Sequence, residues 1–155
     1  MVNIEFIGIL GSGKSTTGLK TAELSVSEFL PENFEGCEFL KQQYKREQEN
    51  QETGETLNPF LLKTQYWFLN QILKDEKECK KSRKASYVRD GNLTQCLAYI
   101  YTAYDNHKIN SEELATYIKT FHLSFKNSIT RDEKTKVFML DTEPKEVLKR
   151  IQIGS

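Results

Sequence analysis

The residues with the clearest chemistry form one glycine-rich segment near the start of the chain, Gly8–Ser15, with the sequence GILGSGKS. This segment matches the phosphate-binding pattern G-x-x-x-x-G-K-[ST] at each fixed position. Glycines permit a tight turn whose backbone N–H groups surround phosphate oxygens. We expect Lys14 to contact the β- and γ-phosphates of a nucleotide, and the Ser15 hydroxyl to bind Mg²⁺. The alternative is an ordinary Gly-rich turn between a strand and a helix.

The sequence on either side of this segment favours phosphate binding. Residues 2–7 read as a short buried strand, and an amphipathic pattern typical of a helix begins at Ser15. A strand, a glycine loop and a helix in this order place the positive end of the helix dipole at the loop. The residues predicted to bind the nucleotide are Gly8, Gly11, Ser12, Gly13, Lys14, Ser15 and Thr16.

A second candidate is Asp90, which follows the predicted strand 85–89. A carboxylate at this position can bind Mg²⁺ through water or hold the phosphate acceptor. The alternative is a polar strand end in which Asp90 and Gly91 form a turn. We predict that Asp90 is catalytic and helps to bind the metal. Asp141 also ends a predicted strand, but a helix starts at Pro144, so capping is the expected role of Asp141.

A third candidate is Gln65, which lies in an apolar helix beside the aromatic residues 66–68. A side-chain amide donates and accepts hydrogen bonds at once, which suits the edge of a nucleobase, and an aromatic ring from this segment or from Tyr44 can stack on the base. On spacing alone, a surface amide next to core aromatics is the more common arrangement. His107 and His122 have no partner at metal-ligand or triad spacing, and we assign them no role.

The order of the predicted elements indicates an α/β fold with a parallel sheet covered by helices on both faces. Ligands bind such folds at the carboxyl ends of the strands, where Gly8–Ser15 and Asp90 both lie. The polar stretch 41–58 is interpreted as a solvated helix or a mobile loop. The predicted strands are 2–7, 36–40, 85–89 and 137–140; the predicted helices are 15–30, 60–74, one after Asp90, one capped by Asn110 and Glu113 that carries a core stripe to Phe125, and one from Pro144.

The composition bounds the class of protein. A length of 155 residues predicts one domain, residues 1–155. Lys and Arg together number 22, as do Asp and Glu, so the zero net charge gives no argument for binding a nucleic-acid polymer or a membrane surface. The three cysteines form no C-x-x-C pair, which favours a reducing, cytoplasmic setting over a zinc site or a disulfide framework. The first apolar run is too short and interrupted for a signal peptide or a membrane span.

These motifs together resemble the P-loop deoxynucleoside kinases and the related thymidylate kinases. The resemblance implies a three-layer P-loop NTPase fold, ATP and Mg²⁺ as cofactors, and a base-reading role for Gln65. It also implies an arginine-bearing lid and a last strand after Ser155, which this chain would lack. The matching segments are Ile4–Thr17, Asn58–Leu61, Lys63–Leu69, Val88–Asp90, Ala98–Tyr99, Lys108–Glu113 and Val137–Ile151.

The chain departs from the family pattern at several functional positions. Gly91 stands where the family has an arginine that holds the acceptor. The family's general-base glutamate has two candidates, since Glu38 fits the distance from the glycine loop and Glu52 fits the distance to Asn58. A base-reading acid is not evident near residues 94–96, and the arginine expected two turns after Gln65 is replaced around residue 72.

The leading hypothesis is transfer of the γ-phosphoryl group of ATP to a deoxynucleoside. The alternatives are a thymidylate-type kinase that acts on a nucleoside monophosphate, suggested by Ala98–Tyr99, and a nucleotide-binding module without turnover, suggested by Gly91 and the absent lid. A GTPase is poorly supported, since the chain has no N-K-x-D motif. The expected partner is a nucleoside or nucleotide rather than a nucleic-acid polymer or a membrane, and the resemblance leaves a homodimer open.

Overall fold

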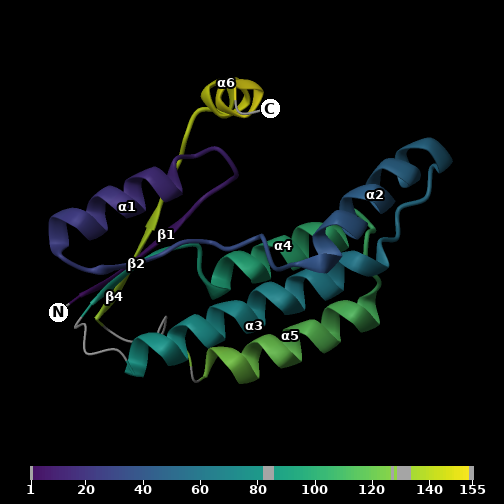
Figure 1. Ribbon diagram of the computed structural model, residues 1–155. Helices are drawn as coiled ribbons and strands as arrows, with labels where there is room; N and C mark the ends of the chain where they lie inside the picture. The colour runs from purple at the N-terminus through teal and green to yellow at the C-terminus, as the bar shows by residue number, and fades with distance from the viewer. Residues whose placement is uncertain (1, 82–85, 127, 129–133, 154–155) are drawn as a thin grey trace. The chain divides into compact units, whose positions relative to one another are not determined.

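The computed structural model describes residues 2–81, 86–126, 128 and 134–153 (Figure 1). These residues form two compact units, each built from several stretches of the chain. We call residues 1–32, 77–92 and 132–155 the sheet unit, and residues 33–76 and 93–131 the helical unit. The elements in chain order are β1 (Asn3–Ile7), α1 (Lys14–Ser25), β2 (Glu28–Leu30), α2 (Glu38–Thr53), α3 (Pro59–Lys81), β3 (Tyr87–Asp90), α4 (Leu93–Asp105), α5 (Ser111–Phe125), β4 (Thr135–Met139) and α6 (Pro144–Ile153).

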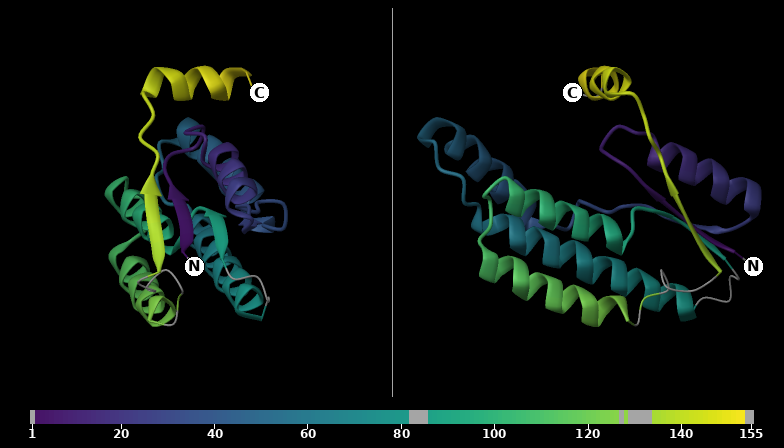
Figure 2. Two further views of the ribbon diagram at one scale, coloured as in Figure 1. Left: turned by 90° about the vertical axis from the view of Figure 1, so that its left-hand side faces the viewer. Right: turned by 180° about the vertical axis from the view of Figure 1, so that it is seen from behind.

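The sheet unit contains four parallel strands in the order β2-β3-β1-β4 (Figure 2). In this register Phe6 pairs with Asp90 and with Phe138, so β1, β3 and β4 end at the same edge. Helix α1 packs on the sheet, where Ala22 contacts Phe6 and Val88 in a small buried core. The α/β fold with a parallel sheet, predicted from the sequence, is confirmed.

The second strand lies earlier in the chain than predicted. The sequence indicates a helix to Leu30 and a strand at 36–40, but α1 ends at Ser25 and β2 covers Glu28–Leu30. Val26 stops the helix because it adopts a left-handed conformation (φ 52°), and its N–H bonds back to Ala22 and Glu23. The chain then turns into β2, which brings the Phe29 ring against the core and against Gly18. The predicted end of the first helix at Leu30 and the predicted strand at 36–40 are therefore both wrong.

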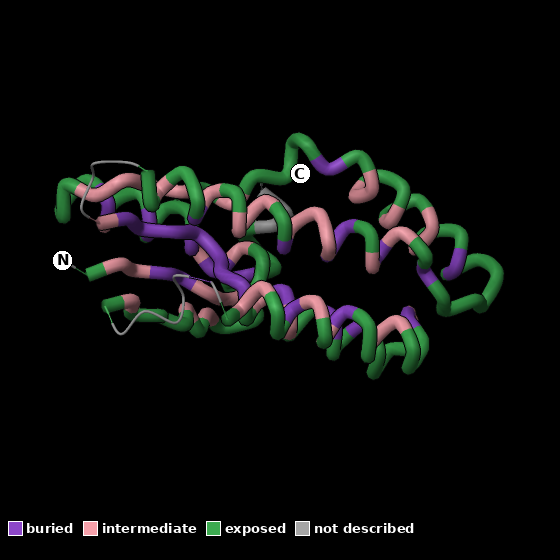
Figure 3. Tube along the Cα trace, turned by 90° about the horizontal axis from the view of Figure 1, so that it is seen from below, coloured by how far each residue is buried: buried purple, intermediate pink, exposed green. Residues whose placement is uncertain are grey.

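The helical unit has its own hydrophobic core, formed where α3, α4 and α5 lie alongside one another (Figures 1 and 2). Helix α5 starts with the predicted capping box, in which Asn110 and Glu113 exchange side-chain and backbone hydrogen bonds. Buried residues recur at intervals along these helices, as amphipathic packing requires (Figure 3). The buried members of the core are Leu61, Leu69, Leu93, Ile100, Ala103, Ile109, Tyr117 and Phe121.

The polar stretch 41–58 is largely helical. Helix α2 runs from Glu38 to Thr53 and ends at Gly54, which takes the left-handed conformation of a helix C-cap. Asn58 is buried and accepts a hydrogen bond from the Phe60 N–H, so it caps α3 just before Pro59. Of the two interpretations left open by composition, the helix holds for most of this stretch.

Ala85, placed in the third strand by the sequence, lies outside the described residues. In the part of the chain that the structure describes, every helix is too short or too polar to cross a bilayer.

Candidate functional site

The glycine loop ends in an uncapped helix N-terminus. Gly13 occupies the N-cap of α1 with a φ of 94°, which favours glycine, and within the described chain no side chain caps this end. No acidic residue lies in the first turn of α1. The first N–H groups of a helix and its dipole attract anions, and an acid here would repel them. The geometry therefore suits a phosphate group at Lys14 and Ser15.

The Lys14 ammonium lies along the glycine loop. Its Nζ donates hydrogen bonds to the carbonyl oxygens of Gly8 (3.0 Å) and Ile9 (3.1 Å), and the residue is largely buried. Glycine is required at position 8 because the backbone there packs closely against Leu140 and Ser12. A Cβ at this position would lie only 2.8 Å from the Leu140 carbonyl oxygen and from the Ser12 hydroxyl. The loop thus holds one positive charge beside the start of α1.

Ser15 and Asp90, two residues predicted to bind the metal, are in direct contact. The Ser15 hydroxyl donates a hydrogen bond to Asp90 Oδ2. Asp90 Oδ1 is buried and has no hydrogen-bond partner among the described residues. The end of β3 is fixed, because the Gly91 N–H donates to the Phe6 carbonyl oxygen at 2.8 Å.

This pair fits a magnesium ion. A hydroxyl and a carboxylate are hard oxygen ligands, and Mg²⁺ typically takes one or two protein ligands together with water and phosphate oxygens. In the described residues no cluster of three or more His, Cys, Asp or Glu side chains could hold a metal alone. The residues present therefore suit an ion that takes its remaining ligands from water and phosphate oxygens.

Glu32 belongs to this site although it is not among the residues predicted from the sequence. Burial and, as the second cause, the nearby Asp90 charge raise the pKa of the Glu32 carboxyl from its usual 4.5 to about 7, and Lys14 opposes the shift. A Cβ on Gly91 would lie 3.7 Å from the Glu32 carboxyl carbon, so the two residues are neighbours. Glu32, Asp90 and Lys14 thus form one group of charges at the carboxyl ends of the strands.

The two glutamates that the resemblance offered as general bases lie elsewhere. Glu38 and Glu52 are exposed on α2, in the helical unit. Glu32 instead follows β2 by two residues and lies in the sheet unit with Asp90. The sequence held one signal for it, the run Phe29-Leu30-Pro31, because a proline that follows two apolar residues can end a short strand as well as a helix.

Arg150 is a second residue that the sequence did not single out. It lies on α6, and its Nη1 donates a hydrogen bond to the Gly11 carbonyl oxygen at 3.1 Å. The same atom is 3.6 Å from where a Cβ on Gly13 would lie. The Thr142 hydroxyl also contacts the loop, donating to the Ser12 carbonyl oxygen at 3.1 Å. The segment after β4 therefore adds a guanidinium to the glycine loop.

Arg89, the arginine next to Asp90 in the sequence, is turned away from this group. Adjacent residues of a strand point to opposite faces of the sheet, so Asp90 faces Ser15 while Arg89 faces Glu5. Glu5 is 0% exposed and accepts hydrogen bonds from Arg89 Nη1 (3.5 Å), the Tyr87 hydroxyl (3.1 Å) and Asn92 Nδ2 (3.2 Å). Burial, and next the Glu5 charge, raise the pKa of Tyr87.

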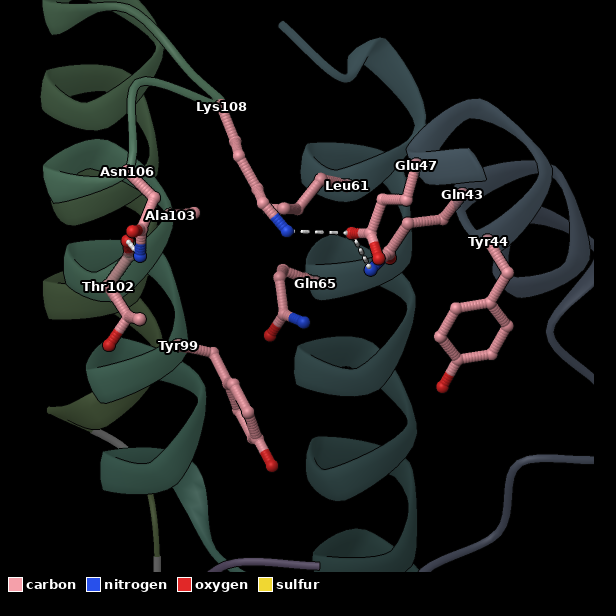
Figure 4. Close-up of a pocket in the computed structure, with 10 residues that line it drawn as sticks. All are labelled: Gln43, Tyr44, Glu47, Leu61, Gln65, Tyr99, Thr102, Ala103, Asn106 and Lys108. Carbon is pink, nitrogen blue, oxygen red and sulfur yellow. Dashed lines mark hydrogen bonds and ion pairs between the residues drawn. The ribbon is translucent and has the colours of Figure 1, made fainter. Parts of the chain in front are cut away.

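The helical unit contains a pocket of about 260 Å³ that includes Gln65 (Figure 4). Gln65 projects into the middle of the pocket, with Tyr44 of α2 and Tyr99 of α4 on either side. Its Oε1 is buried and lacks a hydrogen-bond partner among the residues that the structure describes. The pocket is lined by Gln43, Tyr44, Glu47, Leu61, Gln65, Tyr99, Thr102, Ala103, Asn106 and Lys108.

The aromatic residues nearest Gln65 in the sequence pack elsewhere. The Tyr66 ring lies 5.0 Å from the ring of Tyr117 in the core, and the Trp67 ring packs against Phe68. Tyr44, the other aromatic considered from the sequence, does line the pocket. The hydrogen-bonding capacity and aromatic edges expected of a base site therefore occur together here.

Comparison with known proteins supports the fold. No family model and no curated protein matches the chain. Deoxyadenosine kinase from M. mycoides, solved with the products dCMP and a flexible dCDP, has 21% identity and a TM-score of 0.73 over 97% of this chain and 70% of its own. The same kinase with dATP gives 21% and 0.73 over 98% and 70%, and with dCTP 19% and 0.71 over 99% and 70%. The chain has the P-loop fold of these deoxynucleoside kinases, as the resemblance implied.

Proposed function

We propose that this protein transfers the γ-phosphoryl group of ATP to a hydroxyl group of a deoxynucleoside. The observation that supports the proposal is the group formed by Lys14, Ser15, Glu32 and Asp90, in which a hydroxyl–carboxylate pair and a carboxyl of raised pKa lie near an uncapped helix N-terminus. The similarity to deoxyadenosine kinase structures supports the same reaction class.

The donor phosphates would be bound by the sheet unit. The N–H groups at the start of α1 and the Lys14 ammonium would hold the β- and γ-phosphates, and Ser15 and Asp90 would hold Mg²⁺. The ion neutralises charge on the phosphate oxygens when it is bound. Arg150, which contacts the loop at Gly11, would add a second positive charge near the transferred group. Such charge stabilisation is the main contribution of a protein to phosphoryl transfer.

Glu32 is the proposed general base. The acceptor oxygen would form a bond to the γ-phosphorus as the bond to the leaving oxygen of ADP breaks, and the proton of the acceptor hydroxyl would pass to the Glu32 carboxylate. A base works best when its pKa is near the working pH, and burial beside Asp90 gives Glu32 a pKa of about 7. Asp90 thus has two roles, as a metal ligand and as a charge that tunes Glu32.

The base of the acceptor would bind in the pocket around Gln65. A volume of about 260 Å³ is at the small end for ligand sites, which are roughly 300–1,000 Å³ for drug-sized molecules, and suits a heterocycle better than a whole nucleotide. The M. mycoides structures contain dCMP, dATP and dCTP, which supports a nucleoside or nucleotide as the partner of this fold.

A nucleotide-binding module without turnover is the second candidate, and Gly91 favours it. Glycine at this position gives the site no side chain beside Glu32. The nearby Arg89 cannot replace it, because Arg89 forms an ion pair with Glu5. A coupled assay of ADP formation with deoxynucleosides, and separately with dTMP for a thymidylate-type kinase, distinguishes the candidates. ADP formed only in the presence of an acceptor supports the kinase.

Paired titrations of ATP and of nucleosides test the two halves of the proposal separately. Lys14→Ala should weaken ATP binding by about 1.5–3 kcal/mol, because a charge-assisted contact is lost, and should leave nucleoside binding unchanged. Gln65→Leu should weaken nucleoside binding by about 1–3 kcal/mol and leave ATP affinity unchanged. Calorimetry on the wild type and both variants measures the affinity of each protein for ATP and for the nucleoside. An unaltered ATP affinity in Lys14→Ala would show that the phosphate assignment is wrong.

A further inference from the structure

We propose that Gln43 is a second base-reading residue, and that its fixed carbonyl oxygen selects bases that carry an exocyclic amino group. The inference deepens the proposed function and rests on it, since it concerns the same pocket around Gln65. It adds a residue of α2 that neither the sequence motifs nor the phosphate site points to. Three observations in the helical unit carry it.

The first observation is that the Gln43 amide has one possible orientation. Its Nε2 donates a hydrogen bond to Glu47 Oε1 at 3.3 Å (Figure 4). The Lys108 ammonium donates to the same oxygen at 3.1 Å and forms a salt bridge with the Glu47 carboxylate. An ionised carboxylate accepts hydrogen bonds and donates none. The amide nitrogen of Gln43 must therefore face Glu47, and the carbonyl oxygen must face the other way.

The second observation is that this carbonyl oxygen lacks a donor. Gln43 Oε1 is buried and has no hydrogen-bond partner among the residues that the structure describes. Gln43 lines the pocket together with Gln65. A buried acceptor without a partner is unfavourable, and a ligand that supplies an N–H group removes that penalty. A ligand that brings a second acceptor to the same place is rejected for the same reason.

The third observation concerns Gln65, whose amide is not fixed in this way. Within the described residues Gln65 Oε1 accepts no hydrogen bond, so no such contact fixes the orientation of this amide. A free glutamine can pair with the edge of adenine or cytosine in one orientation, and with the edge of thymine, uracil or hypoxanthine in the other. Gln65 alone therefore does not distinguish an amino group from a carbonyl group on the base.

Gln43 resolves this ambiguity. An exocyclic amino group has two N–H donors, so it can serve the carbonyl oxygens of Gln65 and Gln43 together. A carbonyl group at the same ring position has no donor and would oppose the Gln43 oxygen. Since the Lys108–Glu47 pair prevents Gln43 from turning, the pocket should favour amino bases. Glu47 and Lys108 act through Gln43 and are positioning residues.

Matched nucleosides test this selectivity. Deoxycytidine has an amino group and a bare ring nitrogen where deoxyuridine has a carbonyl group and a ring N–H, and deoxyadenosine and deoxyinosine form a second such pair. Calorimetric titration of the wild type should give about tenfold or greater preference for the amino member of each pair. Gln43→Leu should reduce this ratio to near one. Gln42→Leu, an exposed neighbour on α2, is the matched control and should keep the wild-type ratio.

Glu47→Gln separates selectivity from general damage to the pocket. A glutamine at position 47 both donates and accepts, so the Gln43 amide becomes free to turn. Deoxyuridine should then bind more tightly than it does to the wild type, while deoxycytidine binds no better. A loss of structure would weaken both ligands alike, so a gain for the carbonyl nucleoside is specific to the proposed role.

The outcomes distinguish this inference from the function on which it rests. If the wild type binds ATP but neither member of either pair at millimolar concentration, the acceptor half of the proposed function is overturned together with the inference. If the wild type binds all four nucleosides equally, or if Gln43→Leu keeps the preference, the role of Gln43 is wrong and the kinase proposal stands.

Discussion

At the scale of single residues, Glu32 carries a buried carboxyl whose pKa is strongly raised. Burial and the neighbouring Asp90 raise its pKa to about 7, so the folded protein holds this proton more tightly than the unfolded chain does. Between about pH 4.5 and 7 the folded state therefore binds more protons than the unfolded state. Its stability falls as the pH rises through this window, because the unfolded chain can ionise at Glu32 while the buried carboxyl of the folded state keeps its proton. The charged form that the proposed reaction needs is thus the form that the folded state disfavours.

Glu32→Gln should separate these two effects. The variant should be more stable than the wild type at pH 8, by on the order of 1–3 kcal/mol, and this difference should shrink toward pH 4.5. If the protein is a kinase, turnover should fall by roughly 10²–10⁴-fold, because the proton acceptor is lost. Chemical denaturation at several pH values and a rate assay measure both. The exposed Glu38→Gln is the control, and a stability difference that does not vary with pH would contradict the assignment.

The residues of the phosphate site were predictable where the motif is local. Lys14, Ser15 and the glycines lie within one short segment, so spacing alone identifies them. Asp90 is 75 residues from Ser15, yet a carboxylate after a strand was enough to single it out. Glu32 and Arg150 were not predictable in this way. Their roles depend on which strands are neighbours and on where α6 lies against the loop, which no local pattern records.

At the scale of elements, the contact between α6 and the glycine loop has a clear consequence. Arg150→Met keeps an unbranched side chain but removes the guanidinium that donates to the Gly11 carbonyl oxygen. We expect ATP affinity to fall by about 1.5–3 kcal/mol, as for other charge-assisted contacts, with little change in thermal stability. Lys149→Met, an exposed neighbour on α6, is the matched control. Equal ATP affinities of the two variants would show that Arg150 does not contact the phosphates.

The predicted limits of helices and strands were wrong where a helical and a strand pattern overlap in the sequence. Apolar residues continue at helical spacing through Phe29, so the sequence extends the first helix over the segment that forms β2. Only the packing of Phe29 on Gly18 and the core shows why the chain must turn there. In α2, the polar composition hides the pocket residues, because Gln43 and Glu47 resemble the exposed glutamines and glutamates around them. Helix α5 was predictable, since its capping box is local.

At the scale of the whole molecule, each unit has its own core. Leu69 is 1% exposed in the core of the helical unit, whereas Leu24 of α1 is 88% exposed. Leu69→Ala should lower the free energy of unfolding by about 2–5 kcal/mol through the lost contacts and the cavity, and Leu24→Ala should change it by less than about 0.5 kcal/mol. Equilibrium denaturation measures both.

The same pair tests how nucleotide binding depends on the helical core. The residues proposed to hold the phosphates all lie in the sheet unit, so the ATP affinity of folded Leu69→Ala should equal that of the wild type. ATP should then raise the stability of both proteins by the same amount, since this gain depends only on concentration and affinity. A smaller gain in Leu69→Ala would show that the phosphate site requires an intact helical core.

The buried pair of Glu5 and Arg89 limits how this sequence can evolve. Losing either partner strands a charge in the interior, which costs about 3–5 kcal/mol, whereas replacing both by apolar residues of similar volume is often neutral. Replacing the two residues one after the other therefore passes through an unstable single variant. The two positions should change together or persist together across descendants of this chain. Arg89 can therefore persist beside Asp90 because Glu5 on β1 requires a partner, even if Arg89 has no part in the proposed reaction.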